Sequence, residues 1–117
     1  MPIDYADVFS ILADALPEFK PSAEDLEDRL SYPFLSDMVR FVCDRAYPDI
    51  PEYDTRLRQL AALMEKLISD GDSKVHDLAH DGLDSVWACQ EREIVAGYFG
   101  SKTREIWKRI CSEEHGR

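Results

Sequence analysis

The fold is decided most clearly by residues 53–71, which read YDTRLRQLAALMEKLISDG. Apolar side chains recur there every three or four residues, the period that places them on one face of an α-helix. Asp70-Gly71 closes the pattern, as expected at the end of a helix. Leu63 lies off the apolar face, which predicts a central helix with neighbours on more than one side. The predicted inward face comprises Tyr53, Leu57, Leu60, Ala61, Met64, Leu67 and Ile68.

Three shorter helical patterns precede this stretch. The first begins behind Asp4 as a possible N-cap and is stopped by Pro17, the second follows Ser22, and the third restarts at Pro33. Two prolines within Tyr47–Pro51 then form a rigid turn. The predicted inward residues are Tyr5, Val8, Phe9, Leu12 and Leu16, then Leu26 and Leu30, then Phe34, Leu35, Met38, Phe41 and Val42, with Val39 and Cys43 on the flank.

A further helix is predicted to begin at Asp72 or Ser73. Gly82 lies in the middle of its apolar face, where glycine costs about 1 kcal/mol relative to alanine. We therefore expect a neighbouring helix to approach closely at that position. The predicted inward face comprises Val75, Leu78, Ala79, Gly82, Leu83 and Val86.

The helical phase slips near residues 88–91, which predicts a break. Ser101 is then predicted to cap a last helix, and residues 112–117 are expected to fray. The predicted inward residues of this last helix are Thr103, Ile106, Trp107 and Ile110. The chain has no strand pattern, internal repeat or second domain. We therefore predict one all-α domain over residues 1–117, a compact bundle of about six or seven antiparallel helices or a small stack of helical hairpins.

The charge of the chain is strongly and unevenly negative. The net charge is −10, and residues 70–84 hold five Asp against one Lys, whereas residues 101–110 hold four basic residues against one Glu. A nucleic-acid partner is disfavoured, because phosphates must be met by clustered Lys and Arg. A basic protein surface is the favoured partner, since opposite potentials steer encounter. The alternative is that the acidity only maintains solubility.

Cysteine usage and hydropathy favour the cytoplasm. The three cysteines, Cys43, Cys89 and Cys111, are odd in number and widely spaced, as expected of free thiols in a reducing compartment. The first residues lack the basic start and apolar run of a signal peptide. No segment approaches the ~18 apolar residues of a membrane span, so we expect no membrane partner.

His76 and His80 are the best candidates for a metal site. Their i, i+4 spacing places two imidazoles on one face of a helix, and Asp72 and Asp84 extend the row. A zinc site needs a third ligand, and the zincin glutamate is absent, so we favour a boundary or interface role and predict no metal and no cofactor.

No residue cluster predicts catalysis. Glu24, Asp25, Glu27 and Asp28 lie on a short polar helix that offers little burial to separate their pKa values. A triad of Cys43 or Cys89 with a histidine and an acid would depend on unknown geometry. Free amides at Gly100-Ser101 could bind an anion, but a plain helix start is the favoured interpretation. We therefore predict that the protein is not an enzyme.

The acidic helix and its preceding turn form the predicted partner-binding surface. The alternative interpretation is that this acidic face contacts only solvent. For Trp87 and Trp107, the alternative to a binding role is burial in the core. The candidate binding residues are Asp70, Asp72, His76, Asp77, His80, Asp81, Asp84 and Trp87.

Residues 60–110 resemble a family of small bacterial helical proteins. The family pattern V-x-x-L-x-x-x-G is met by Val75, Leu78 and Gly82, and its Gly-Pro-(Lys/Arg)-(Thr/Ser)-Arg-x-x-Trp helix resembles residues 100–107, GSKTREIW. Ser101 stands in place of proline, and the acid after the glycine is displaced by one position. The family is linked to polymorphic toxins, so the resemblance implies an immunity protein without assigning an activity to single residues.

The leading hypothesis is thus a cytoplasmic immunity protein that binds a cognate bacterial toxin and occludes its active or binding surface. The second is a helical adaptor, which predicts an exposed apolar groove between helices instead of a charged docking face. The third is a metal protein or enzyme centred on His76 and His80.

Overall fold

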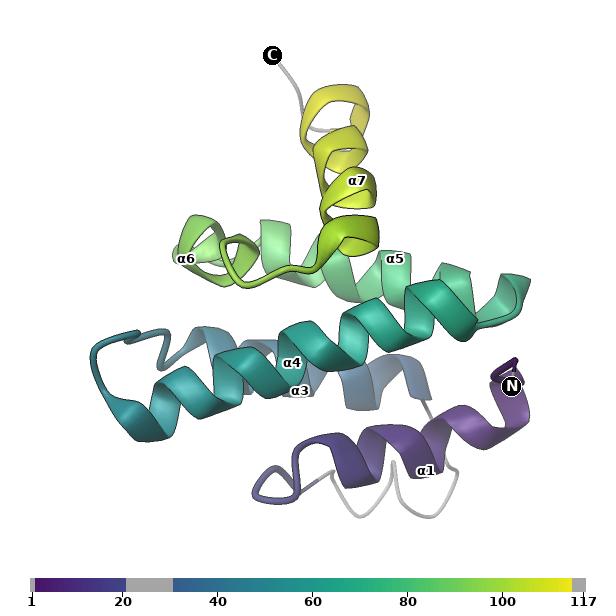
Figure 1. Ribbon diagram of the computed structural model, residues 1–117, viewed down its shortest axis with the longest axis horizontal. Coiled ribbons are helices and arrows are strands. Elements are labelled where there is room, and N and C mark those ends of the chain that lie inside the picture. Colours follow the sequence, from purple (N-terminus) through teal and green to yellow (C-terminus); the bar gives the residue numbers. More distant parts are fainter. Residues whose placement is uncertain (1, 21–30, 115–117) are drawn as a thin grey trace.

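Helix α4 (Pro51–Asp70) lies at the centre of the fold, against α1 (Tyr5–Ala15), α3 (Ser31–Cys43), α5 (Ser73–Trp87) and α7 (Ser101–Arg109). The computed structural model describes residues 2–20 and 31–114, and its remaining elements are α6 (Arg92–Ala96) and a π-helical turn, η1 (Ile110–Glu114) (Figure 1). The described residues contain six α-helices and no strand, which confirms the predicted all-α bundle. The helix predicted behind Ser22 lies outside the described residues.

Helix α4 runs antiparallel to both α3 and α5, so α3 and α5 run in the same direction (Figure 1). The Oγ atoms of Ser36 on α3 and Ser85 on α5 are 3.3 Å apart. Helix α7 stands steeply against this layer (Figure 1). Within residues 2–20 and 31–114, no helix is long and apolar enough to cross a membrane.

The predicted apolar faces form one core. Every predicted inward residue of α5 is buried, and Leu63 of α4 is only 4% exposed, as expected for a central helix. Phe41 and Tyr53 are only partly buried, and the guanidinium of Arg56 covers both rings, 4.7 Å from the centre of Phe41 and 5.0 Å from that of Tyr53. Glu18, which follows the C-terminal end of α1, accepts two hydrogen bonds from that guanidinium, at 2.7 and 2.8 Å.

The start of the described chain corrects the sequence reading in detail. Asp4 occupies the N-cap position of α1 but makes no capping hydrogen bond with its side chain. Ile3 instead ties the start of the chain to the α4–α5 turn, where its N–H donates to the Asp70 carbonyl. At the other end, residues 112–114 belong to η1, and the fraying predicted for residues 112–117 stays a prediction.

Gly82 is the point of closest packing between α3 and α5. A Cβ atom at this position would lie 2.8 Å from Cδ2 of Leu35 and 3.2 Å from its Cγ, with Cε of Met64 at 3.3 Å. The predicted close approach of a neighbouring helix is thereby confirmed, and α3 is that neighbour.

Replacing Gly82 with valine should destabilise the domain by about 2 kcal/mol, because the added side chain would force α3 and α5 apart. Urea unfolding monitored by circular dichroism measures this change. Lys74→Val, at an exposed position of the same helix, is the matched control and should cost only the small helix-propensity difference of valine. Equal stability of the two variants would contradict the close-contact assignment.

Candidate functional site

The outer face of α5 carries most of the predicted binding residues. His76 and Asp77 are exposed, whereas Asp81 is partly buried. The side chains of His80 and Asp84 are each 40% exposed, and Nδ1 of His80 lies 3.5 Å from Oδ2 of Asp84. We call His76, Asp77, His80, Asp81 and Asp84 the α5 ridge. It presents three carboxylates and two imidazoles on the side of α5 that faces away from the core.

Two of the predicted binding residues have structural positions instead. Asp72 is the N-cap of α5, where one carboxylate oxygen accepts the Val75 N–H at 2.9 Å and the other accepts the Tyr5 N–H at 3.4 Å. Its carboxylate therefore joins the starts of α1 and α5. Asp70 is exposed, but its carbonyl holds the N–H of Ile3 at 2.6 Å. Both residues lie at the base of the ridge.

Tyr32 of α3 borders the acidic side of the ridge. It is 38% exposed, and its pKa is raised by burial first, then by Tyr5, Asp77 and Asp81. A carboxylate near a phenol disfavours the phenolate, so the neutral hydroxyl remains beside the acids as a hydrogen-bonding group. This tyrosine extends the ridge with an aromatic surface that the sequence analysis did not assign.

Trp87 lies at the C-terminal end of the ridge within an aromatic cluster. Its ring centre is 6.1 Å from that of Trp107, which in turn contacts Phe99. The guanidinium of Arg92 stacks over Trp87 at 4.3 Å and donates to the carbonyls of Trp87 and Cys89. Both tryptophans are partly buried, so they are neither wholly core nor wholly interface. Trp107 joins the candidate surface only through tertiary contacts, whereas Arg92 contacts Trp87 locally, from five residues further along the chain.

The ridge does not form a metal site among the described residues. His76 and His80 lie on adjacent turns, but no group of three His, Cys, Asp or Glu side chains there could hold a metal ion. Cys89 follows the C-terminal end of α5, whereas His76 lies in its first turn, so these two members of the triad considered from sequence do not meet. The carboxylates at residues 24–28 lie outside the described residues.

The start of α7 binds an anion that belongs to the protein itself. Gly100, not Ser101, is the N-cap, so the predicted cap is wrong. The carboxylate of Glu65 on α4 accepts three hydrogen bonds. Two come from Thr103, from its N–H at 2.9 Å and from its hydroxyl at 2.8 Å, and the third comes from the Lys102 N–H at 3.3 Å. Burial acts to raise the pKa of Glu65, but the hydrogen bonds from Thr103 and Lys102 outweigh it and hold that pKa below its ordinary value.

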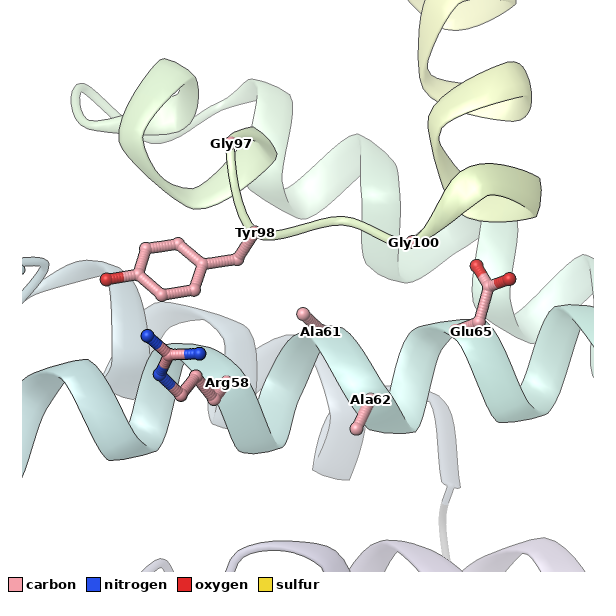
Figure 2. Close-up of a pocket in the computed structure, with 7 residues that line it drawn as sticks. All are labelled: Arg58, Ala61, Ala62, Glu65, Gly97, Tyr98 and Gly100. Carbon is pink, nitrogen blue, oxygen red and sulfur yellow. The ribbon is translucent and has the colours of Figure 1, made fainter.

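Beside this cap lies a cavity of about 590 Å³, between α4 and the loop that joins α6 to α7. Figure 2 shows Arg58 and Tyr98 at one end, Glu65 at the other, and Ala61 and Ala62 along the floor. The Tyr98 hydroxyl and Nε of Arg58 both donate to Asp54, at 2.5 and 2.9 Å. The polar side chains that line this cavity are thus hydrogen-bonded to residues beside it, Arg58 and Tyr98 to Asp54 and Glu65 to Thr103.

A second, more apolar groove of about 360 Å³ runs between α1 and α4. Ala62 borders both hollows, so they meet at this exposed alanine. The groove is lined by Ile11, Asp14, Ala15, Gln59, Ala62, Leu63 and Lys66.

Comparison with protein-family models, curated proteins and solved structures finds no significant match to this chain. The family resemblance of residues 60–110 therefore stays a prediction. The proposed function depends on the geometry of the α5 ridge and its aromatic end.

Replacing Glu65 with glutamine should destabilise the domain by about 1 kcal/mol near neutral pH, because a neutral amide caps α7 less well than a carboxylate. The lowered pKa of Glu65 means that its stabilisation is present above the unfolded-state value near 4.5 and is lost as the pH falls through the folded-state value. Urea unfolding at several pH values should show the difference between wild type and variant shrinking in acid. Glu105→Gln is the control, because it removes one exposed carboxylate of α7 that takes no part in the cap. A pH-independent difference would contradict the charged cap.

Proposed function

We propose that this protein is a cytoplasmic immunity protein, which binds a cognate bacterial toxin and occludes its active or binding surface. The α5 ridge is the docking surface, and the partner presents a basic cleft. The role is one of binding, without catalysis, cofactor, nucleic acid or membrane.

One observation carries the proposal: the acidic ridge ends at a partly exposed aromatic cluster. Carboxylates steer a basic partner and set its orientation, but exposed charges alone add little affinity. Partly buried tryptophans with a stacked arginine provide the type of contact that dominates binding energy at protein interfaces. Asp77, Asp81 and Trp87 combine both contributions along one helix.

The ridge also suits inhibition by occlusion. Helix α5 is held from behind by α3 and α4 and at its start by the Asp72 cap. A rigid helix loses little conformational entropy when it docks, which favours tight association. The acidic side chains then occupy a basic cleft that the toxin needs for its own substrate or target.

The charge of the ridge should control the rate of association with the toxin. Replacing Asp77, Asp81 and Asp84 with lysine should slow association on the order of tenfold or more at low salt, because it reverses the steering potential. The first experiment co-expresses the protein with the product of the adjacent open reading frame. It scores growth rescue and co-purification, followed by stopped-flow association of the purified pair.

The matched control makes the same formal charge change elsewhere. Asp7, Asp49 and Glu113 are exposed and lie on α1, on the α3–α4 turn and on η1. Their replacement with lysine should leave rescue intact and association closer to wild type. Circular dichroism verifies that both triple variants fold. If the neighbouring product is harmless, or kills despite abundant folded protein, immunity is rejected; unchanged association after the ridge reversal rejects the site.

The groove between α1 and α4 favours a second candidate, a helical adaptor that joins other proteins of the cell. Its Ile11, Ala15 and Leu63 lining is the kind of apolar surface that an amphipathic helix binds. Ala62→Glu would place a charge at the junction of the two hollows while leaving the ridge unchanged. A partner that Ala62→Glu releases and the ridge reversal retains would support the adaptor over the immunity protein.

A further inference from the structure

Two cysteines that are far apart in sequence meet at one end of the α3–α5 pair. Cys43 is the last residue of α3 and is 2% exposed. Cys89 follows the end of α5, is partly buried, and directs its thiol to the Ser85 carbonyl at 3.4 Å. Each thiol affects the pKa of the other, and Glu91 and Asp44 act on both, so the two side chains share one environment.

This contact follows from the direction of the helices. Because α3 and α5 run the same way, their contacts advance together, from Leu35 beside Gly82 to the Ser36–Ser85 pair. Their C-terminal ends therefore also lie next to each other, which brings Cys43 to Cys89. Cysteines at adjacent helix ends can be joined by an S–S bond of about 2 Å where their Cα atoms come within about 7 Å of each other.

We propose that Cys43 and Cys89 form a redox-sensitive dithiol, which hydrogen peroxide converts into an intramolecular disulfide that fastens the end of α3 to the end of α5. Cys89 is the entry thiol because it is the more accessible of the two, and Cys43 is the resolving thiol. The device is independent of the partner proposed above.

The chemistry balances with peroxide as the oxidant. The Cys89 thiolate attacks one peroxide oxygen, which breaks the O–O bond, forms a sulfenic acid and releases one water. The Cys43 sulfur then attacks the sulfenic sulfur and displaces its oxygen as a second water. Two thiols and one peroxide thus become one disulfide and two waters.

The reaction is expected to be slow and to need an excess of peroxide. Burial is the largest cause that raises the pKa of both thiols, with Glu91 and Asp44 adding to it and Arg40 opposing it at Cys89. The reactive thiolate is therefore a small fraction near neutral pH. The dithiol should remain reduced in ordinary cytoplasm and respond to oxidative stress.

The test uses the full chain, treated with hydrogen peroxide, alkylated under denaturing conditions and measured by intact mass and peptide mapping. We expect the loss of two hydrogen masses, one cross-linked peptide pair containing Cys43 and Cys89, and a rise in Tm on the order of 10 °C. Cys111→Ser should behave as wild type. Cys43→Ala should leave a sulfenic acid at Cys89 that dimedone traps.

Mapping of the wild-type chain decides the proposal even if a variant fails to fold. A bond that includes Cys111, a bond only between two chains, or oxidation that leaves Cys43 and Cys89 as thiols would overturn it. Dimedone labelling at Cys43 rather than Cys89 in the single variants would overturn the order of attack.

Discussion

The close packing of α3 against α5 at Gly82 is the constraint on which the rest of the structure depends. With no side chain at residue 82, Leu35 fits directly against the α5 backbone, and the two helices lie side by side in the same direction. This contact turns the opposite face of α5, with its acids and histidines, away from the core. It also brings Cys43 to Cys89. Both the proposed docking surface and the proposed dithiol therefore depend on the packing at this glycine.

Helix α4 supplies the complementary constraint. It has neighbours on several sides, and one of them is α7. Helix α4 holds α7 by apolar packing and by one polar contact, the Glu65 cap. A carboxylate accepting amide hydrogen bonds at a helix start is favoured by the positive end of the helix dipole. The anion site considered at Gly100-Ser101 is thus occupied from within the fold, and its nearest cavity is lined by groups already paired.

Much of the fold was predictable from the sequence because helices are specified locally. The apolar face of α5, the end of α4 at Asp70 and the break before Arg92 all follow from periodicity and from local end signals. The candidate site was predictable only in part. Ridge residues such as Asp77 share a helix face by spacing alone, whereas Trp107 reaches Trp87 through a tertiary contact. Asp72 matched the pattern of a binding acid, yet its two oxygens serve backbone amides. Glu65 carries no local signal at all, since its partner amides lie 38 residues away.

The Asp72 contact to Tyr5 has a consequence for the order in which the chain folds. The two residues are 67 positions apart, so this hydrogen bond and the Ile3 contacts close one of the longest loops in the domain. Loop closure costs entropy that only a preformed docking site repays. During synthesis, α3 and α4 emerge before the α4–α5 turn, so α1 can already pack against them, for instance through Phe9 on Phe34, before this loop closes. The apolar packing of α1 and the hydrogen bonds that fix its start are therefore separate steps, and the hydrogen bonds to Asp70 and Asp72 can form only after the turn has been made.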